Sequence, residues 1–367
     1  MRLQLTTLAC LLLATGGSDL RADEVDERAS SEARLRVYTD DDHVTVVSPS
    51  AATQFDLTDS LQLALATSVD VVSAASVDVT TQASPTEIKE LRVEGASTLT
   101  ASLSPSLRLR LGGIVSHETD YDSFRPTLGG QIEVAKRNAI IDLAYTASID
   151  SVTSAADADF KRSRRGHIAS VGITQILDSQ TYIDLLVDVR RFAGYHASPY
   201  RKVPLVNQLS SELSFVDEHT PRLRHSGAGL VQLRRAIGGE GRWFAHGSYR
   251  YYGDDWDITS HTLSAQLLHS LARDRYLIGL RLRGYHQGAA DFYQAYYQAS
   301  EMPTFVTRDR ILGGMDSAHT SLTVDAALVG GWRLTGMLAL THFRFDNFPA
   351  QRERNALTTG LSLQAPM

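Results

Sequence analysis

Apolar and polar residues alternate along most of this chain, which is the pattern of a β-strand with two different faces. The segment SLRLRLGG (106–113) alternates three leucines with Arg108 and Arg110. Successive side chains of an extended strand point to opposite faces, so this segment would carry leucine on one face and guanidinium groups on the other. The same period recurs in TYIDLLVDVR (181–190), YLIGLRLRGYH (276–286) and THFRFDN (341–347). The alternation predicts an all-β chain and leaves open whether the leucines face a protein core or lipid.

The connections between the predicted strands are sorted by length, and this favours lipid. Short turns are expected at 57–60, 104–106, 136–138, 177–180, 238–241, 272–274 and 330–332. Longer polar segments alternate with them at 74–90, 118–125, 150–165, 193–220, 254–258, 288–303 and 347–355. Outer-membrane barrels have short periplasmic turns at one end and longer extracellular loops at the other. A soluble sandwich has no reason to sort its loops in this way.

We therefore predict a closed antiparallel transmembrane β-barrel of about 16 strands, with roughly 14 or 18 as the alternatives. The strands are expected at 33–40, 43–57, 60–73, 91–102, 106–117, 126–136, 138–149, 166–177, 181–192, 221–237, 242–253, 259–270, 275–287, 304–329, 333–346 and 356–366. The segment GGMDSA (313–318) inside 304–329 is interpreted as a bulge or a turn. The segment 193–220 is long enough to fold inward as a constriction of the lumen.

The N-terminus is predicted to be a cleaved secretory signal peptide. Arg2 precedes the apolar run LTTLACLLLA (5–14), and LRA ends at Ala22 before the acidic segment DEVDE. This is the order of a charged region, an apolar region and a cleavage site. The expected organisation is a signal peptide at 1–22, a short periplasmic linker at 23–32 and an outer-membrane barrel at 33–367. Cys10, the only cysteine, lies within the signal, so disulfides are not expected to stabilise the mature chain.

Aromatic residues cluster near both ends of the predicted strands. Trp243, Tyr276 and Trp332 lie beside short turns. Tyr251, Tyr252, Trp256, Tyr285, Phe292 and Tyr293 lie near the longer loops. Rings at the two ends of the strands are typical of the aromatic girdles of membrane barrels.

Five segments spread over most of the mature chain carry a family resemblance. They are SVDVVSAASVDVTTQASP (68–85), GYHASPYRKV (194–203), EHTPRLRHSGAGLVQLRR (218–235), SYRYYGDDWDITSHTL (248–263) and GYHQGAADFY (284–293). In these segments the chain resembles an uncharacterised bacterial family catalogued as domain of unknown function number 3570. The resemblance implies an outer-membrane β-barrel-like protein with no assigned reaction, and it brings no catalytic residues.

Charged residues occupy the bodies of the predicted strands beside lipid-type residues. If these charges face the lumen of a barrel, they set a field and an ion preference. If they pair completely with one another, they are a structural filling, and both interpretations stay open. The candidate lumen-lining residues are Arg108, Arg110, Asp184, Asp188, Arg190, Arg281, Arg283, Arg344 and Asp346, and Asp142, Arg234 and Arg250 share their pattern.

The acidic residues of one loop are candidates for a cation site. Asp254, Asp255 and Asp257 offer the oxygen ligands that Ca²⁺ prefers, and such loops can also bridge lipopolysaccharide through divalent cations. The alternative is an acidic loop that is simply solvated. The sequence contains no HExxH, GxSxG or P-loop motif, so no catalytic residue, no metal site and no cofactor are predicted.

These observations predict a passive channel or transporter for small hydrophilic solutes in the outer membrane of a Gram-negative bacterium, with a charged Arg/Asp lumen. The alternative is a structural or partner-binding barrel with a closed lumen, followed by an outer-membrane hydrolase; an enzyme is not expected. The expected partners are the lipid bilayer, lipopolysaccharide, the barrel assembly machinery and other envelope proteins. The formal net charge of −6 gives no basic surface for nucleic acid.

Overall fold

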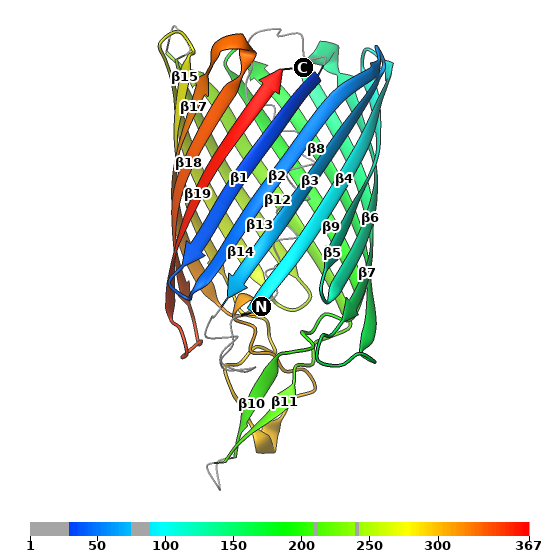
Figure 1. Cartoon of the computed structure of the whole chain (residues 1–367), viewed down its shortest axis with the longest axis vertical. Helices are drawn as coiled ribbons and strands as arrows, with labels where there is room; N and C mark the ends of the chain where they lie inside the picture. The colour runs from blue at the N-terminus through cyan, green and yellow to red at the C-terminus, as the bar shows by residue number, and fades with distance from the viewer. Residues whose placement is uncertain (1–28, 75–87, 208–211, 239–241, 367) are drawn as a thin grey trace.

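Sixteen antiparallel strands close into a cylinder (Figure 1). The structure, a computed structural model, describes residues 29–74, 88–207, 212–238 and 242–366. The predicted signal peptide lies outside the described residues. The barrel strands are β1 (Ala29–Asp40), β2 (Val44–Thr58), β3 (Leu61–Ala74), β4 (Ile88–Ser104), β5 (Leu107–Glu118), β6 (Tyr121–Val134), β7 (Ala139–Thr153), β8 (Lys161–Asp178), β9 (Thr181–Gly194), β12 (Leu223–Ile237), β13 (Trp243–Asp254), β14 (Thr259–Leu271), β15 (Tyr276–Gln287), β17 (Met315–Ala327), β18 (Arg333–Phe345) and β19 (Glu353–Pro366).

The first and last strands pair with each other, which closes the sheet. Leu35 lies opposite Leu361 in the ladder between β1 and β19, and β1 pairs with β2 on its other side. Every barrel strand therefore has a hydrogen-bonded neighbour on both sides. A backbone group without a partner is strongly destabilising in hydrocarbon, so a sheet can span a bilayer only when it closes in this way.

The two ends of the cylinder differ in their connections. Short turns join the strands at the upper end in Figure 1, and the longer loops extend from the lower end. The predicted strand count is confirmed, and the longest connections lie at the loop end. The long loop predicted at 118–125 is wrong, because β5 and β6 are joined there by a two-residue turn. Among the described connections, 3-10 turns occur at η1 (Ala135–Arg137), η2 (Ala299–Glu301), η3 (Arg310–Leu312) and η4 (Val329–Gly331). Within the described ranges, no helix has the length and apolar character needed to cross a membrane.

Side chains alternate between the convex outer face and the concave inner face of the wall. Leu109 and Leu111 are 42% and 62% exposed, as expected for the outer face. Arg110, on the opposite face, donates a hydrogen bond to Asp142, which lies two strands away on β7. The arginine side chain crosses Gly129 of β6 to reach it. A side chain spans an intervening strand most readily on the concave side, so the arginines of SLRLRLGG point into the barrel.

One predicted strand, 304–329, is shorter in the structure. Only β17 is extended, and the residues before it form part of a loop. Asp309 caps the turn η3 by accepting a hydrogen bond from the Ile311 amide (3.2 Å). Arg310 in the same turn is buried and lies 2.8 Å from Asp42, in the turn between β1 and β2. These contacts hold the chain in a turn where the alternation predicted a strand.

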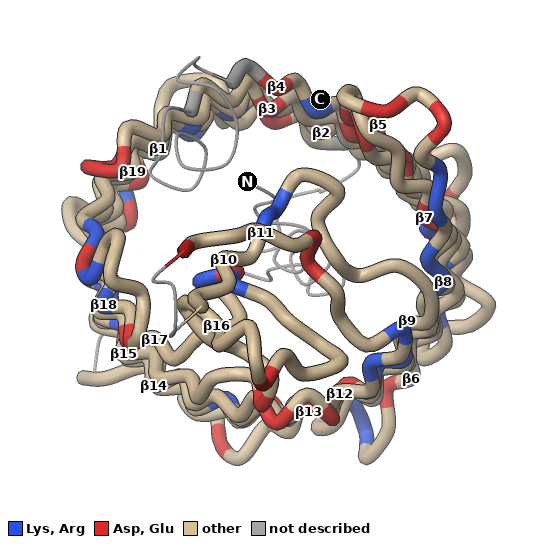
Figure 2. The backbone as a smooth tube through the Cα atoms, turned by 90° about the horizontal axis from the view of Figure 1, so that it is seen from below, with Lys and Arg blue, Asp and Glu red and all other residues tan. Residues whose placement is uncertain are grey.

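A small second sheet lies beyond the loop end of the barrel. It consists of β10 (Lys202–Val206), β11 (Leu213–Asp217) and β16 (Tyr297–Gln298), in the order β11–β10–β16. We call the described residues of 195–222 and 288–314 the cap. Figure 2 shows the cap lying across part of the barrel mouth. The segment 193–220 therefore sits at the mouth, where the sequence suggested a constriction folded into the lumen.

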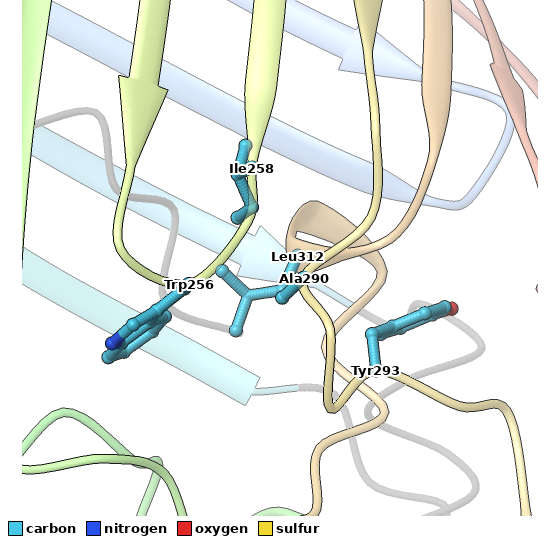
Figure 3. Packing of buried hydrophobic residues seen from close by; sticks show 5 residues of the cluster. All are labelled: Trp256, Ile258, Ala290, Tyr293 and Leu312. Carbon is cyan, nitrogen blue, oxygen red and sulfur yellow. The ribbon is translucent and has the colours of Figure 1, made fainter.

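Two apolar clusters hold the cap together. One joins Val203, Leu205, Tyr297 and Val306 of the small sheet and its neighbours. The other lies where the loops leave the barrel and contains Trp256, Ile258, Ala290, Tyr293 and Leu312 (Figure 3). Trp256 and Tyr293 were expected in an outer girdle, and the structure buries them in this cluster. They pack there because the long loops need an apolar core of their own.

The two faces of β5 can be distinguished by chemical labelling. In a Cys10→Ser background, we expect Arg108→Cys in membranes to react with a water-soluble thiol reagent and Leu109→Cys to react with a lipid-dissolved one. The physical reason is the alternation of the wall, which separates adjacent residues by the thickness of the sheet. Equal labelling of both cysteines from water would contradict the barrel orientation.

Candidate functional site

One half of the inner wall, from β3 to β8, carries a network of paired charges. Glu94 accepts hydrogen bonds from Arg92 (2.9 Å) and Arg125 (2.7 Å). Arg92 also lies 3.8 Å from Asp70 and 3.7 Å from Glu118. The side chains of Arg92, Glu94 and Arg125 are nearly buried. Buried charges of this kind are tolerated because they neutralise one another.

Asp150 is the centre of a second paired cluster in this half of the wall. Its carboxylate accepts hydrogen bonds from Ser123 (2.8 Å), Ser148 (2.7 Å) and the Nε of Arg164 (2.8 Å). Arg164 also donates to the hydroxyl of Tyr121 (2.6 Å). The Asp150 side chain is fully buried. This cluster is a structural filling between strands and offers little free charge to a solute.

The facing half of the wall carries arginines that make no ion pair with a carboxylate. Arg250 on β13 and Arg281 and Arg283 on β15 make no ion pair within the described part of the chain. Arg281 donates to a glutamine oxygen on β14, and the guanidinium groups of Arg250 and Arg283 lie over the rings of Tyr252 and Tyr285. Arg250 and Arg283 are close enough for their charges to repel each other, and Arg250 is also close enough to Asp188 to be attracted to it. We call Arg250, Arg281 and Arg283 the cationic strip.

The order of the strands places the cationic strip and the paired network on opposite sides of the lumen. In the closed ladder, β14 and β4 are separated by eight steps in either direction around the sixteen strands. On one side of the lumen the carboxylates and arginines pair with one another, and on the other side the three arginines of the cationic strip make no ion pair. Such an arrangement sets a transverse field across a water-filled lumen.

Most of the sequence-predicted lumen residues face the inside of the barrel. These are Arg108, Arg110, Asp184, Asp188, Arg190, Arg281 and Arg283. On β9, Asp188 is paired with Arg190, and Asp184 accepts from Thr174 (2.7 Å). Asp346 follows the last residue of β18 and lies in the loop, outside the strand wall.

Arg344 faces outward, contrary to the prediction. It shares a strand face with Leu340, which is exposed on the outer wall. Phe343 and Phe345 point inward instead, and the guanidinium of Arg354 lies 4.4 Å over the Phe343 ring. Close to the cap, aromatic rings pack inside the barrel mouth. Over 343–345 the apolar side chains therefore face the inside of the barrel, and the charged side chain faces outward.

The structure does not bring Asp254, Asp255 and Asp257 together as a cation site. Asp254 is buried and accepts from Arg224 Nε (2.9 Å), the Tyr252 hydroxyl and two backbone amides. Asp255 is paired with a histidine on β12, and Asp257 is exposed. Across the residues that the structure describes, no group of three His, Cys, Asp or Glu side chains could hold a metal ion.

Buried ion pairs fix the cap over the mouth. Arg201 lies 3.1 Å from Glu218 and 2.9 Å from Asp309. Glu218 also accepts a hydrogen bond from the hydroxyl of Thr307. The hydroxyl of Tyr297 contacts the Thr307 amide (2.9 Å), which ties the small sheet to the same point. The cap is thus a packed unit with its own polar centre.

His196 lies inside the cap, next to positive charge. Its ring packs edge-on against Trp256, with 5.4 Å between the centroids. Burial, together with the charges of Arg164 and Arg224, lowers the pKa of His196 to about 4. Its Nε2 atom is buried without a hydrogen-bond partner. The imidazole is therefore neutral at pH 7.

Sequence reasoning missed the paired network and the polar centre of the cap. For the network a signal exists, since Arg92 and Glu94 alternate with apolar neighbours as clearly as Arg108 and Arg110 do. For the cap there is no local signal. Arg201 and Asp309 are more than a hundred positions apart, and only the folded loops bring them together.

These features define a porin-like outer-membrane β-barrel. The chain belongs to the family described as "Protein of unknown function (DUF3570)", whose model matches residues 75–168 and 155–344. The family resemblance of its sequence motifs is confirmed. Among curated proteins, no sequence matches this chain.

Solved structures of outer-membrane proteins share the fold. One, titled "Bacterial polysaccharide outer membrane secretin", has a TM-score of 0.55 at 8% identity and is covered completely by 94% of this chain. Another, "CdiB from Acinetobacter baumannii", has a TM-score of 0.52 at 7% identity, with 92% of this chain covering 60% of that chain. At these identities the similarity shows the fold alone.

The buried pair in the cap can be compared with an exposed pair beside it. We expect Arg201→Met to destabilise the cap by about 3–5 kcal/mol, because Glu218 and Asp309 would lose their buried cation. Hydrogen exchange of the cap amides measures this change. Lys202→Met is the matched control, since Lys202 pairs with Asp217 in an exposed position and such pairs contribute about 0–1 kcal/mol. Equal effects of the two variants would contradict the assignment.

His196 should make the cap sensitive to acid. Its pKa is about 4 in the closed cap and about 6.5 when exposed, so the opened cap binds an extra proton between these values. Stability of the closed cap is therefore expected to fall as the pH drops from about 6.5 towards 4. Cap hydrogen exchange, corrected for intrinsic rates, should show this opening in the wild type. In His196→Phe the dependence should weaken, and an unchanged dependence would exclude His196 as its source.

Proposed function

We propose that this protein is a passive channel for small hydrophilic solutes in the outer membrane of a Gram-negative bacterium, and that it prefers anions. The cationic strip is the observation that carries the proposal. Its three guanidinium groups make no ion pair in the described wall, although Asp188 attracts Arg250, whereas the inner carboxylates of the facing half are in ion pairs. A solute that passes the strip therefore meets uncompensated positive charge.

The inner wall is accessible enough to support a water-filled lumen. The side chain of Arg108 is 52% exposed although it points into the barrel, and Arg281 and Arg283 are also exposed. Barrels of about 16 strands are wide enough for an aqueous channel. Water in the lumen also explains how unpaired arginines are tolerated, because burial without water or a counter-ion would be strongly destabilising.

The cap favours small solutes over large ones. It lies across part of the mouth (Figure 2) and is held there by apolar packing and buried ion pairs. A fixed cover reduces the opening through which a solute enters. The same observation favours the second candidate, a partner-binding barrel whose lumen is closed.

Ion currents across a planar bilayer test the proposal. In a KCl gradient, we expect the purified wild type to give stepwise currents whose reversal potential indicates a preference for chloride. Replacing the strip with Arg250→Gln, Arg281→Gln and Arg283→Gln should remove most of this preference, because it removes the uncompensated charge. Reversal potentials of both proteins are the measurement.

A charge-neutral change in the wall is the matched control. Arg110 and Asp142 are paired in the facing half of the wall, so Arg110→Gln combined with Asp142→Asn should leave the selectivity almost unchanged. Cation preference in the wild type would contradict the anion preference. Complete electrical silence of folded protein would favour the closed, partner-binding barrel.

A further inference from the structure

A group of basic side chains lies on the outer wall of the barrel, away from the lumen. Arg165 on β8 and Arg191 on β9 are both exposed. Arg165 shares a strand face with Val171, and Arg191 with Val189, and these valines are exposed on the outer wall. Figure 2 shows Lys and Arg residues gathered along these two strands. The group therefore faces the surroundings of the barrel.

The registers of three neighbouring strands bring the basic residues together. Arg191 lies opposite His167 of β8 on one side and opposite His225 of β12 on the other. Arg165 is two residues further along β8, and Lys161 continues the same face. Diagonal neighbours in a sheet are about 7–8 Å apart. We call Arg165, His167 and Arg191 the outer basic patch.

The two arginines of the outer basic patch lack protein partners. Within the described residues, neither Arg165 nor Arg191 makes an ion pair or a side-chain hydrogen bond. Two carboxylates of this outer face contact histidines instead: Asp122 is 2.6 Å from His117, and Asp255 is 2.8 Å from His225. The two guanidinium charges of the patch are therefore not held in ion pairs with the protein.

The position of the outer basic patch along the barrel axis indicates which layer of the membrane it contacts. From Ala169 to Leu177, the outward positions of β8 are apolar except Gln175, and this run spans nine residues. A tilted strand needs about 9–11 residues to cross the hydrocarbon. The patch begins just beyond this run, at the end of the strand that carries the long loops. It therefore lies at the level of the lipid head groups on the loop side.

A hollow in the outer wall adjoins the patch. It has a volume of about 850 Å³. Val115, Phe124 and Ile149 contribute apolar side chains to it, Lys161 lies at its β8 side, and Asp122, which contacts His117, also lines it. Apolar surface next to basic side chains suits an amphipathic ligand that carries both hydrocarbon and negative charge.

We propose that the outer basic patch binds the phosphate groups of lipopolysaccharide in the outer leaflet. The guanidinium groups of Arg165 and Arg191 donate paired hydrogen bonds to phosphate oxygens, a geometry that suits arginine better than lysine. Acyl chains of the same lipid lie against the apolar outer wall below the patch. The inference rests on the outer-membrane location in the proposed function and does not depend on the channel activity.

Lipid retention by purified barrels tests the inference. Wild-type protein is extracted from outer membranes in detergent, and the lipopolysaccharide bound per barrel is measured by native mass spectrometry. We expect Arg165→Gln combined with Arg191→Gln to lower the retained amount by about tenfold or more, because two charge-assisted contacts to phosphate are lost. Each single variant should give a smaller loss.

Arg344→Gln is the matched control. Arg344 also faces outward near the loop end, but in its ladders it lies opposite Asp316 on β17 and Glu353 on β19. Two carboxylates flank Arg344 and disfavour a bound phosphate there, so its loss should leave lipid retention unchanged. Heat-shift gels confirm that each variant is folded, and substitutions on the outer wall leave the inner wall intact.

Binding of defined lipids distinguishes which membrane lipid supplies the phosphate. Refolded wild type should bind bis-phosphorylated lipopolysaccharide and bind dephosphorylated lipopolysaccharide or phosphatidylglycerol much more weakly. Equal retention by the double variant and the wild type would overturn the inference, as would equal binding of the dephosphorylated lipid. A barrel that retains the lipid but carries no current would reject the channel and keep the lipid site.

Discussion

The pairing of β1 with β19 is the constraint on which the rest of the structure depends. Once the ladder closes, every barrel strand has two hydrogen-bonded neighbours and the sheet can stand in hydrocarbon. Closure also gives the wall an inner and an outer face. Side chains that alternate along a strand therefore face the lumen and the lipid in turn. Leu109 and Arg108, adjacent in the chain, then face different surroundings.

Charged side chains on the inner wall have two different kinds of neighbour. Between β3 and β8, carboxylates and arginines meet across strands and satisfy one another, as Glu94 does with Arg92 and Arg125. Around β13 and β15 the neighbours of the arginines are tyrosines and amides instead. A side chain over an aromatic face keeps its full charge. Arginines paired with carboxylates therefore link the strands on one side of the lumen. Arginines without an ion pair contribute positive charge on the other side.

Alternation in the sequence was sufficient for the wall because a strand's two faces follow from a local period of two. It placed the sixteen strands and the inward position of Arg110 and Arg283. It failed where the surroundings of the strand change. At the loop end of β18, Phe343 and Phe345 pack inside the barrel mouth, so Arg344 between them faces outward. The cap itself depends on contacts such as Arg201 with Asp309, which no local pattern encodes.

The arginines of the wall follow one physical rule, which connects the lumen, the cap and the outer face. A guanidinium is charged at any biological pH, so each one needs a carboxylate, water or another anion. Inner arginines are paired or face the lumen, and the outward Arg344 lies opposite two acidic residues. Arg165 and Arg191 are outward without such neighbours, at the edge of the apolar run. At the head-group level the phosphates of the outer leaflet are the anions within reach of these two side chains, which is why the proposed lipid site lies here and not at Arg344.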